Sequence, residues 1–387
     1  MKSSPLFCLR LSLLAGLAML LHACHGNDHT DATWPVVDID QLPDTIFDCR
    51  SLVRQARIVP LAPEPLVGGI DKVVGRDARF YVLDKTGVQV LAFDRNGHFV
   101  RKFGKLGDGP GEFESIFELV VPSHSDQVIV LKPWTLMFFD TTGKFHRETP
   151  LEFMPSRLGS AGQPDVFCYS TSFDDPQFFV HCIDVRGKIV SKHLPSTRKV
   201  PPHADLSNVS GMLINGPDNR VYVNYPGSSK VYTLRKGRFE PMIQFVGNRF
   251  WPEARKEDIE AFIDRLYAMD DFGYLHKYQI VNTCGAFTFM RDKRIQSLYY
   301  FFDSGKAYGA RNFTDNALRN FLNSTPVGYT EDGGIIFVLD EERKMWLENR
   351  YQNDLSPLVP DLIPSPLWQS LSETRNNPIL VILYFQS

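Results

Sequence analysis

The sequence repeats one pattern six times, and this repetition restricts the possible folds more than any other feature. Each copy contains a β-rich run, a short polar break, an aromatic-rich second run, a turn and a third run. The first runs lie at residues 80–84, 128–131, 166–169, 221–223, 286–289 and 335–339. Their starting positions are 48, 38, 55, 65 and 49 residues apart. Immunoglobulin-like sandwiches need about 100 residues per unit, so this spacing argues against them.

Repeats of roughly 40 to 50 residues with about four short strands each are typical of a β-propeller. Five second runs end in a turn closed by Gly, which favours a positive φ there. These glycines are residues 97, 143, 187, 237 and 305. We therefore predict an all-β chain, folded as a six-bladed β-propeller of four-stranded blades. In the first blade, the strands are expected near residues 70–75, 79–84, 88–94 and 98–104.

The last copy lacks a fourth strand of its own. Residues 378–385 supply its third strand, and the chain stops shortly afterwards. Residues 56–61, which precede the first blade, form a β-rich run that can take the missing place. We expect this N-terminal strand to complete the last blade by pairing with residues 379–384, because such closure protects exposed sheet edges.

The N-terminus is expected to direct export. Residues 11–21 form an apolar run behind Lys2 and Arg10, too short to span a bilayer but suited to a secretory signal. The following residues, up to Cys24, resemble a bacterial lipobox in which His22 is an atypical member. Cys24 would then carry a lipid. Simple secretion with cleavage nearby is the alternative.

These features divide the chain into three parts. We assign residues 1–23 to a signal peptide, 24–50 to a lipid tether and lead-in, and 51–387 to the propeller. Two insertions are expected in the propeller, at about 247–277 and 341–376. The first contains a predicted amphipathic helix at 251–267, and the second begins helically.

The charge composition limits the classes of partner that the chain is expected to bind. The formal net charge is -3, from 42 Lys and Arg against 45 Asp and Glu, which does not favour nucleic-acid binding. We expect a monomer that reaches the membrane through its lipid anchor only. An envelope protein or a glycan is the expected partner. The residues after Cys24 lack a strongly acidic run, so the periplasmic and cell-surface sides of the outer membrane both remain open.

One stretch of the sequence resembles a known family. Residues 80–84, 91–97 and 103–113, the last with the phrase Gly-Asp-Gly-Pro-Gly-Glu-Phe, are similar to six-bladed β-propeller lipoproteins with NHL-like repeats from anaerobic gut Gram-negative bacteria. The resemblance extends from about residue 50 to 385. It implies the fold and export, but almost nothing about biochemical activity.

The Gly-rich phrase and two cysteines have structural interpretations. The phrase lacks the helix-opening Gly-Lys-Ser/Thr of a phosphate loop, so we predict a sharp crossover between blades, with Glu112 accepting backbone N–H bonds. Binding of an anion or a cation is the alternative. This crossover comprises Gly107, Gly109, Pro110, Gly111 and Glu112. After export, only Cys168 and Cys182 are close enough in sequence to suggest a disulfide.

Function is expected on the rim that carries the long, varied connections. The candidate binding face comprises Trp134, Asp174, Asp175, His203, Tyr225, Trp251, Arg291, Arg294, Asp340 and Arg343. The rings among them would bind a glycan, a peptide or a partner lipoprotein together with nearby charges. The competing interpretation of each ring is packing between blades.

An enzyme is the alternative to a binding module. Propeller enzymes assemble their sites from several blades, so a local motif would not reveal one. A metal-dependent hydrolase or lyase would require ligands at the channel mouth, drawn from His203, His276, Asp174, Asp292 and Asp340. Outside this alternative, which would place a divalent cation in the central channel, no cofactor is expected.

Overall fold

The protein is described by a computed structural model, in which strands predominate and the few helices are short. It describes residues 34–42, 46–161, 166–169, 178–195, 212–217, 219–225, 228–248, 250, 273–291, 293–313, 317–350 and 377–386. The predicted signal peptide and the helix predicted at 251–267 lie outside these ranges. The all-β prediction is confirmed.

Six successive units of four strands contain most of the strands. Unit 1 is β3 (Lys72–Arg76), β4 (Arg79–Asp84), β5 (Gln89–Asp94) and β6 (Phe99–Phe103). Unit 2 is β9 (Glu118–Val120), β10 (Gln127–Lys132), β11 (Thr135–Asp140) and β12 (Phe145–Pro150). Unit 3 is β13 (Arg157–Gly159), β14 (Val166–Tyr169), β15 (Phe178–Ile183) and β16 (Ile189–Pro195).

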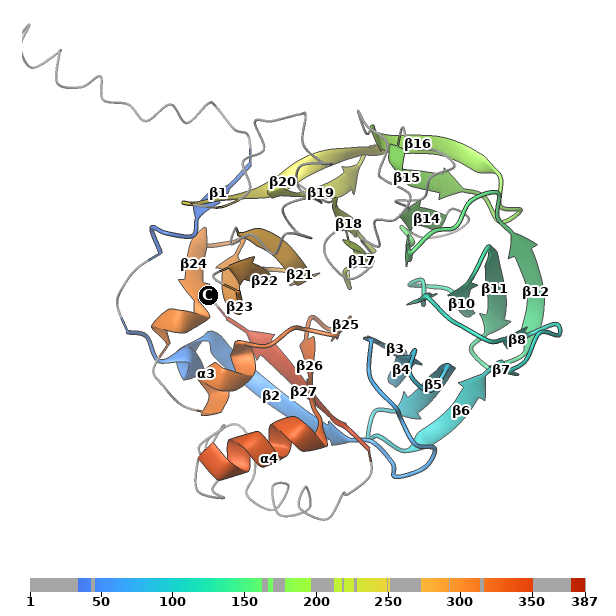
Figure 1. Cartoon of the computed structure of the whole chain (residues 1–387), viewed down its shortest axis with the longest axis horizontal. Helices are drawn as coiled ribbons and strands as arrows, with labels where there is room; N and C mark the ends of the chain where they lie inside the picture. Colours follow the sequence, from blue (N-terminus) through green and yellow to red (C-terminus); the bar gives the residue numbers. More distant parts are fainter. Residues whose placement is uncertain are drawn as a thin grey trace, which may run out of the picture.

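The remaining three units follow the same order of strands. Unit 4 is β17 (Met212–Asn215), β18 (Val221–Asn224), β19 (Lys230–Arg235) and β20 (Arg238–Val246). Unit 5 is β21 (Tyr274–Val281), β22 (Cys284–Arg291), β23 (Arg294–Phe301) and β24 (Lys306–Gly309). Unit 6 is β25 (Gly328–Thr330), β26 (Ile335–Leu339), β27 (Ile379–Phe385) and β2 (Val53–Pro60). Figure 1 shows the units side by side around a common centre, with β3, β17 and β25 near the middle and β6, β12, β16 and β20 outside.

The two ends of the chain meet in unit 6. Strand β2 pairs with β27 in antiparallel fashion, with Ile58 opposite Val381 and Pro60 opposite Ile379. The N-terminal strand thus takes the fourth place in the unit that the C-terminal strand leaves incomplete. The predicted pairing of residues 56–61 with 379–384 is confirmed for 56–60, and Leu61 continues it with a backbone hydrogen bond to the Pro378 carbonyl.

The sheets are not divided into six separate four-stranded blades as predicted. Units 6 and 1 form one eight-stranded sheet, because β25 pairs with β3 in parallel. Two glycines permit this approach: a Cβ at Gly328 would lie 1.8 Å from the Val73 carbonyl oxygen, and a Cβ at Gly75 would lie 2.7 Å from the Thr330 side chain.

The predicted lead-in also contributes to the sheets. Strand β1 (Val36–Asp38) adds a fifth, parallel strand to unit 4 beside β20. A 3-10 helix (Cys49–Leu52) then leads into β2. The part of the lead-in that the structure describes is therefore integrated into the fold.

The helices and one small sheet lie in the connections. They are a second 3-10 helix (Ala310–Asn312), α3 (Ala317–Leu322), α4 (Glu341–Arg350), and the two-stranded sheet of β7 (Lys105–Leu106) and β8 (Glu112–Phe113). Helix α4 confirms the helical start of the second insertion, whereas β21 occupies the last residues of the first predicted insertion. Among the described residues, no helix has the length and apolar character needed to cross a bilayer.

The turns between third and fourth strands share one chemistry in units 1 to 3. Asp94, Asp140 and Asp184 each accept backbone N–H bonds from the residues two and four positions later. The Gly three positions after each Asp donates its N–H to the carbonyl oxygen of that Asp. The five predicted glycines have φ between +68° and +87°, so the predicted positive φ is confirmed.

An Arg on the outer strand of one unit contacts the next unit in three places. Each guanidinium donates to a carbonyl oxygen in the following unit's turn between third and fourth strands. The pairs are Arg57 with Arg95, Arg101 with Thr142, and Arg147 with Val185. Arg57 lies on β2, so β2 contacts unit 1 through the same kind of Arg hydrogen bond by which β6 contacts unit 2.

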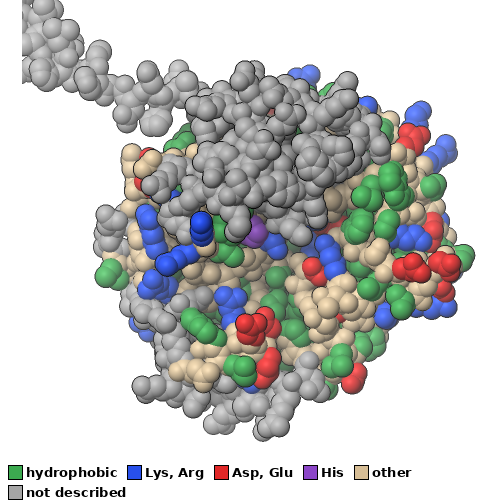
Figure 2. All heavy atoms as spheres, in the orientation of Figure 1, with side chains coloured by type: hydrophobic (Ala, Val, Ile, Leu, Met, Phe, Trp, Pro, Cys, Tyr) green, Lys and Arg blue, Asp and Glu red, His purple; other side chains and the backbone are tan. Residues whose placement is uncertain are grey.

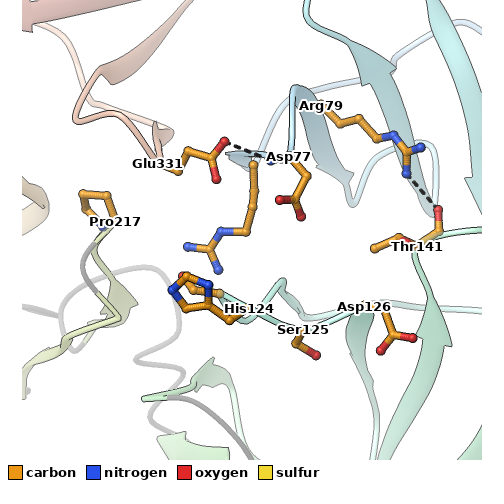
Figure 3. A pocket seen from close by; sticks show the side chains of 10 residues that line it. Asp77, Arg79, His124, Ser125, Asp126, Thr141, Pro217 and Glu331 are labelled. Atoms are coloured by element: carbon orange, nitrogen blue, oxygen red, sulfur yellow. Dashed lines mark hydrogen bonds between the residues drawn. The ribbon is translucent and has the colours of Figure 1, made fainter.

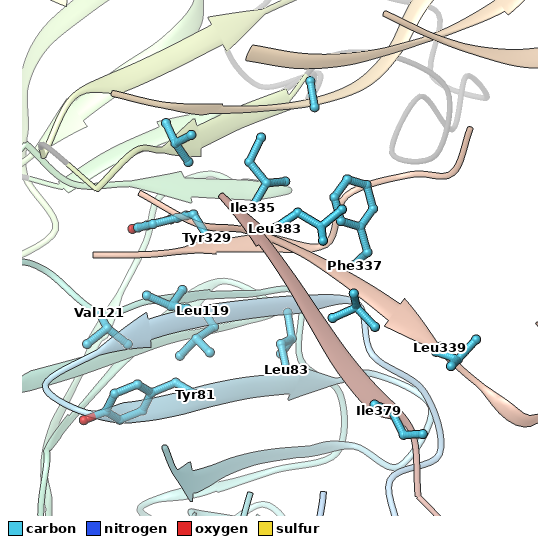
Figure 4. Close-up of a cluster of buried hydrophobic side chains, with 14 of the residues drawn as sticks. Tyr81, Leu83, Leu119, Val121, Tyr329, Ile335, Phe337, Leu339, Ile379 and Leu383 are labelled. Atoms are coloured by element: carbon cyan, nitrogen blue, oxygen red, sulfur yellow. The ribbon is translucent and has the colours of Figure 1, made fainter. Parts of the chain in front are cut away.

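The largest buried cluster joins units 1, 2, 5 and 6. Figure 4 shows part of it, with Tyr81 of β4, Leu119 of β9 and Phe337 of β26 converging on one core. Ile58 of β2 and Leu383 of β27 belong to the same cluster. Packing thus reinforces the hydrogen bonds that join the two ends of the chain.

The suggested disulfide between Cys168 and Cys182 is not formed. Both cysteines are buried, and neither belongs to a disulfide. In the register of β14 and β15, Cys182 stands opposite Phe167 and Cys168 opposite His181. Successive residues of a strand point to opposite faces, and the two thiols accordingly belong to different buried clusters.

Candidate functional site

Four of the ten residues of the predicted binding face fall outside the described residues. Of the candidates, Asp174, Asp175, His203 and Trp251 lie there, as do Cys24 and the possible metal ligand Asp292.

Trp134 and Tyr225 have different environments. Trp134 is 45% exposed and ends the two-residue turn between β10 and β11, with φ at +58°. Tyr225 stacks on Phe179 of the neighbouring unit, with ring centroids 4.8 Å apart and planes 10° apart. Tyr225 therefore packs between units, which was the competing interpretation of these rings.

Arg291 and Arg294 are brought together as opposite residues at the end of the β22–β23 hairpin. Arg294 is exposed, whereas Arg291 forms an ion pair with Asp40 at 2.5 Å. Burial acts to raise the pKa of Asp40, but the Asn248 N–H and Arg291 lower it overall. The ion pair of Arg291 with Asp40 thus links the segment after β1 to unit 5.

Asp340 and Arg343 lie at the start of helix α4 and make structural contacts there. The Arg343 N–H donates to the Asp340 carboxylate at 2.8 Å, and the Lys344 N–H donates to the Asp340 carbonyl at 2.9 Å. Asp340 is therefore the N-cap of the helix. The Arg343 guanidinium lies 5.8 Å from the centre of the Phe321 ring. The structure gives both residues a structural explanation.

The predicted crossover turn joins unit 1 to unit 2. The Glu112 carboxylate accepts the Gly109 N–H at 3.2 Å and pairs with Lys105 at 2.6 Å. Gly107 and Gly111 have φ of +145° and +78°. A Cβ at Gly107 would lie 2.1 Å from the Glu112 carboxylate. The predicted backbone hydrogen bond to Glu112 is thus present, and Gly107 leaves room for the carboxylate.

A cavity of about 300 Å³ receives residues from all six units, and we call it the central cavity. The first strands of units 1, 2 and 3 begin there, at Lys72, Glu118 and Arg157. Its lining is Asp71, Lys72, Leu83, Lys85, Glu118, Arg157, Ile214, His276, Lys277, Tyr278, Gln279, Pro326 and Val327. Four cationic side chains thus face two carboxylates, in a chain whose net charge is -3.

Glu118 organises part of this charge. Its carboxylate lies 3.0 Å from the Lys72 ammonium and 3.9 Å from the Arg157 guanidinium, and it accepts the Leu119 N–H at 3.0 Å. Burial acts to raise the pKa of Glu118, but Lys72, Arg157 and Lys85 outweigh it and lower the pKa. Glu118 is therefore an ionised carboxylate that binds two cations from neighbouring units.

Lys85 and Lys277 are the two cationic side chains of the central cavity that do not pair with Glu118. Within the described residues, neither ammonium group makes a hydrogen bond or an ion pair, and both side chains are partly buried. Burial lowers the pKa of each lysine, and Arg157 lowers both further. The central cavity thus has two more cationic side chains than carboxylates, and Lys85 and Lys277 are the two that form no ion pair within the described residues.

A second cavity lies at the opposite end of β3 and has about 690 Å³. Figure 3 shows Asp77, Glu331, Arg79 and His124 around it. Its backbone and side chains already bond one another: the Asp77 N–H donates to Glu331 at 3.1 Å, and Arg79 donates to the Thr141 carbonyl at 3.1 Å. Acids and bases are mixed here, so this cavity selects a ligand charge less clearly than the central cavity.

The described residues show no metal site. Within those ranges, no three His, Cys, Asp or Glu side chains are grouped so that they could hold an ion. Of the predicted ligands, His276 lines the central cavity, whereas Asp340 caps α4.

The matching family model supplies the classification of the chain. It covers residues 35–384 and is described as a domain of unknown function, DUF4934. The chain belongs to this family. No curated protein matches the DUF4934 chain.

Solved structures show the same fold at low identity. A candidate exported protein of Bacteroides fragilis NCTC 9343 is 15% identical, with a TM-score of 0.71, over 91% of this chain and 100% of that one. A member of the DUF4221 family from Bacteroides vulgatus ATCC 8482 is 10% identical, with a TM-score of 0.50, over 87% and 97%. These likenesses concern the fold and carry no ligand or activity to the DUF4934 chain.

Sequence reasoning missed the basic residues of the central cavity. The predicted binding face lay on the long connections, whereas Lys72 and Arg157 are the first residues of first strands and Lys277 lies within one. The available signal was a charged residue at the start of an otherwise apolar strand, repeated in successive units.

Figure 2 shows the face seen in Figure 1, where basic and acidic side chains are interspersed and a His lies near the middle.

Proposed function

We propose that this chain is an exported, lipid-anchored β-propeller of six blades that acts as a non-catalytic binding module in the cell envelope. Each of the six units is one blade in this proposal. The ring of units in Figure 1, the pairing of β2 with β27, and the repeated Arg contacts between units support it.

Export and anchoring rest on the sequence. The apolar run 11–21 and the lipobox-like residues before Cys24 support a lipoprotein signal. The similar Bacteroides fragilis structure is of a candidate exported protein, which is consistent with this proposal. The outer membrane is the proposed location.

The observation that carries the binding function is the central cavity. It draws residues from all six units, and rigid strands hold most of them. Concave sites with a few converging polar groups are the usual places where proteins bind small ligands. The proposed partner is a glycan, a peptide or an envelope protein that inserts one group into this cavity. No described group of residues favours the metal-enzyme alternative over binding.

Arrays of glycans and peptides, probed with the labelled full chain, test the proposal. We expect a defined set of ligands to bind, and Asp71→Trp to abolish their binding by filling the mouth of the central cavity. Asp126→Trp is the matched control, because Asp126 is also exposed but lines the opposite cavity. Binding that survives Asp71→Trp, or an array without any bound ligand, contradicts the proposal.

A further inference from the structure

The charges of the central cavity identify the chemistry of its ligand. Within the described part of the chain, Lys72 and Arg157 already share the Glu118 carboxylate. Asp71 accepts the backbone N–H of Lys85 at 2.8 Å, and among the described residues the Lys85 ammonium forms no ion pair. The cavity therefore holds more positive charge than its own carboxylates neutralise.

The positive charge of Lys85 also acts on Lys277. Lys277 experiences the positive charges of Arg157 and Lys85, and only Asp71 among the cavity carboxylates opposes them. Such an arrangement is costly in an empty cavity, because partly buried like charges repel and lose hydration. A bound anion would remove both costs. Titratable groups in a cleft whose pKa is shifted by burial and by nearby charges are candidates for a functional site.

We propose that the central cavity binds an anionic group, a carboxylate, sulfate or phosphate carried by the ligand, through the ammonium groups of Lys85 and Lys277. This inference rests on the proposed binding function and specifies its ligand class. Lys72, Glu118 and Arg157 line the same cavity, and there the two cations pair with the Glu118 carboxylate. Lys is suited to this role because its ammonium is a compact charge with three freely rotating donors.

The volume of the cavity limits the size of the ligand group that carries the anion. Its 300 Å³ equals the liquid volume of about ten water molecules. This lies at the lower end of ligand-pocket volumes. One acidic unit of a larger molecule, such as a uronic acid at the end of a glycan or a phosphorylated sugar, is of suitable size.

Calorimetric titration of the full chain tests the inference. The probes are glucuronate, inorganic phosphate and inorganic sulfate, with glucose as the neutral control and sodium chloride holding the ionic strength constant. We expect saturable binding of at least one anion and none of glucose. Lys85→Met and Lys277→Met should each weaken that binding about 10- to 100-fold, as expected for a lost charged hydrogen bond.

Lys144→Met is the control, because Lys144 is exposed in a turn outside the central cavity. It should leave the affinity unchanged. Both cavity variants must still unfold cooperatively on heating, which separates loss of binding from loss of structure. Anion binding that is equally strong in all three variants overturns the inference, and so does the absence of binding by every anion.

The two proposals fail in different ways. If neutral ligands bind on the arrays, Asp71→Trp blocks them and the lysine variants do not, the binding function stands and the anionic ligand is wrong. If Asp71→Trp leaves array binding intact, the central cavity is not the binding site and both proposals are wrong.

Discussion

Lys85 carries a charge that the fold does not fully neutralise. Burial lowers its pKa; Glu118 raises it in part, and Arg157 lowers it further. Between this lowered pKa and the ordinary value of the unfolded chain, the unfolded state binds more protons, so stability rises with pH across that window. At neutral pH the Lys85 charge is therefore destabilising, which is common where a residue is kept for binding.

Lys85→Met should melt at the same temperature as the unmodified protein or higher at pH 7. The difference should shrink as pH rises toward about 10.4, the ordinary Lys pKa, because Lys85 then loses its proton as well. Thermal unfolding across this pH range measures it, with Lys144→Met as the surface control. A variant that melts lower than the unmodified protein at every pH shows that Lys85 stabilises the fold.

Individual site residues were predictable only where local chemistry determines them. The Gly turns and the Glu112 bond follow from residues close in sequence. The pairing of Lys72 with Glu118 joins residues 46 positions apart, and no local pattern indicates that distance. The same limit applies to Arg291, whose partner Asp40 lies 251 positions away.

At the scale of elements, the turn around Gly97 lies directly against β2, so a substitution at Gly97 tests where β2 lies. A Cβ at Gly97 would lie 2.0 Å from the carbonyl oxygen of Pro60, the last residue of β2. Gly237 occupies the equivalent turn of unit 4 with a similar positive φ, yet a Cβ there would have no heavy atom within 4 Å. These two glycines share backbone strain but differ in contact with the N-terminal strand.

Gly237→Ala should cost about 1–2 kcal/mol, the usual cost of an L-residue at positive φ. Gly97→Ala should cost about 2–5 kcal/mol, because the clash with β2 adds to that strain. Urea unfolding of both variants measures the difference. Equal losses would show that β2 does not press on this turn.

Most strands were predictable because period-two patterns and Gly turns mark them. Unit 1 illustrates the accuracy: its second strand was predicted at 79–84, and β4 has the same bounds. The features that were missed include β1 and the β25–β3 pairing. Both depend on packing between segments far apart in sequence, and the latter also on the close approach that Gly75 and Gly328 allow.

For the whole molecule, the pairing of the two chain ends and the lining of the central cavity are connected. The pairing of β2 with β27 completes unit 6, and unit 6 supplies Pro326 and Val327 to the central cavity. The cavity is locally basic although the chain as a whole carries a net charge of -3. The excess positive charge of the cavity therefore arises from the arrangement of the units and not from overall composition, so composition alone could not predict it.

Lysine acetylation followed by mass spectrometry tests the central claim most directly. The full chain is briefly acetylated with and without the tightest-binding anion among glucuronate, phosphate and sulfate, and modification is quantified at each Lys. The account predicts that the anion protects Lys85 and Lys277, while exposed Lys144 reacts equally in both samples. Equal modification of Lys85 and Lys277 with and without a saturating anion would contradict it.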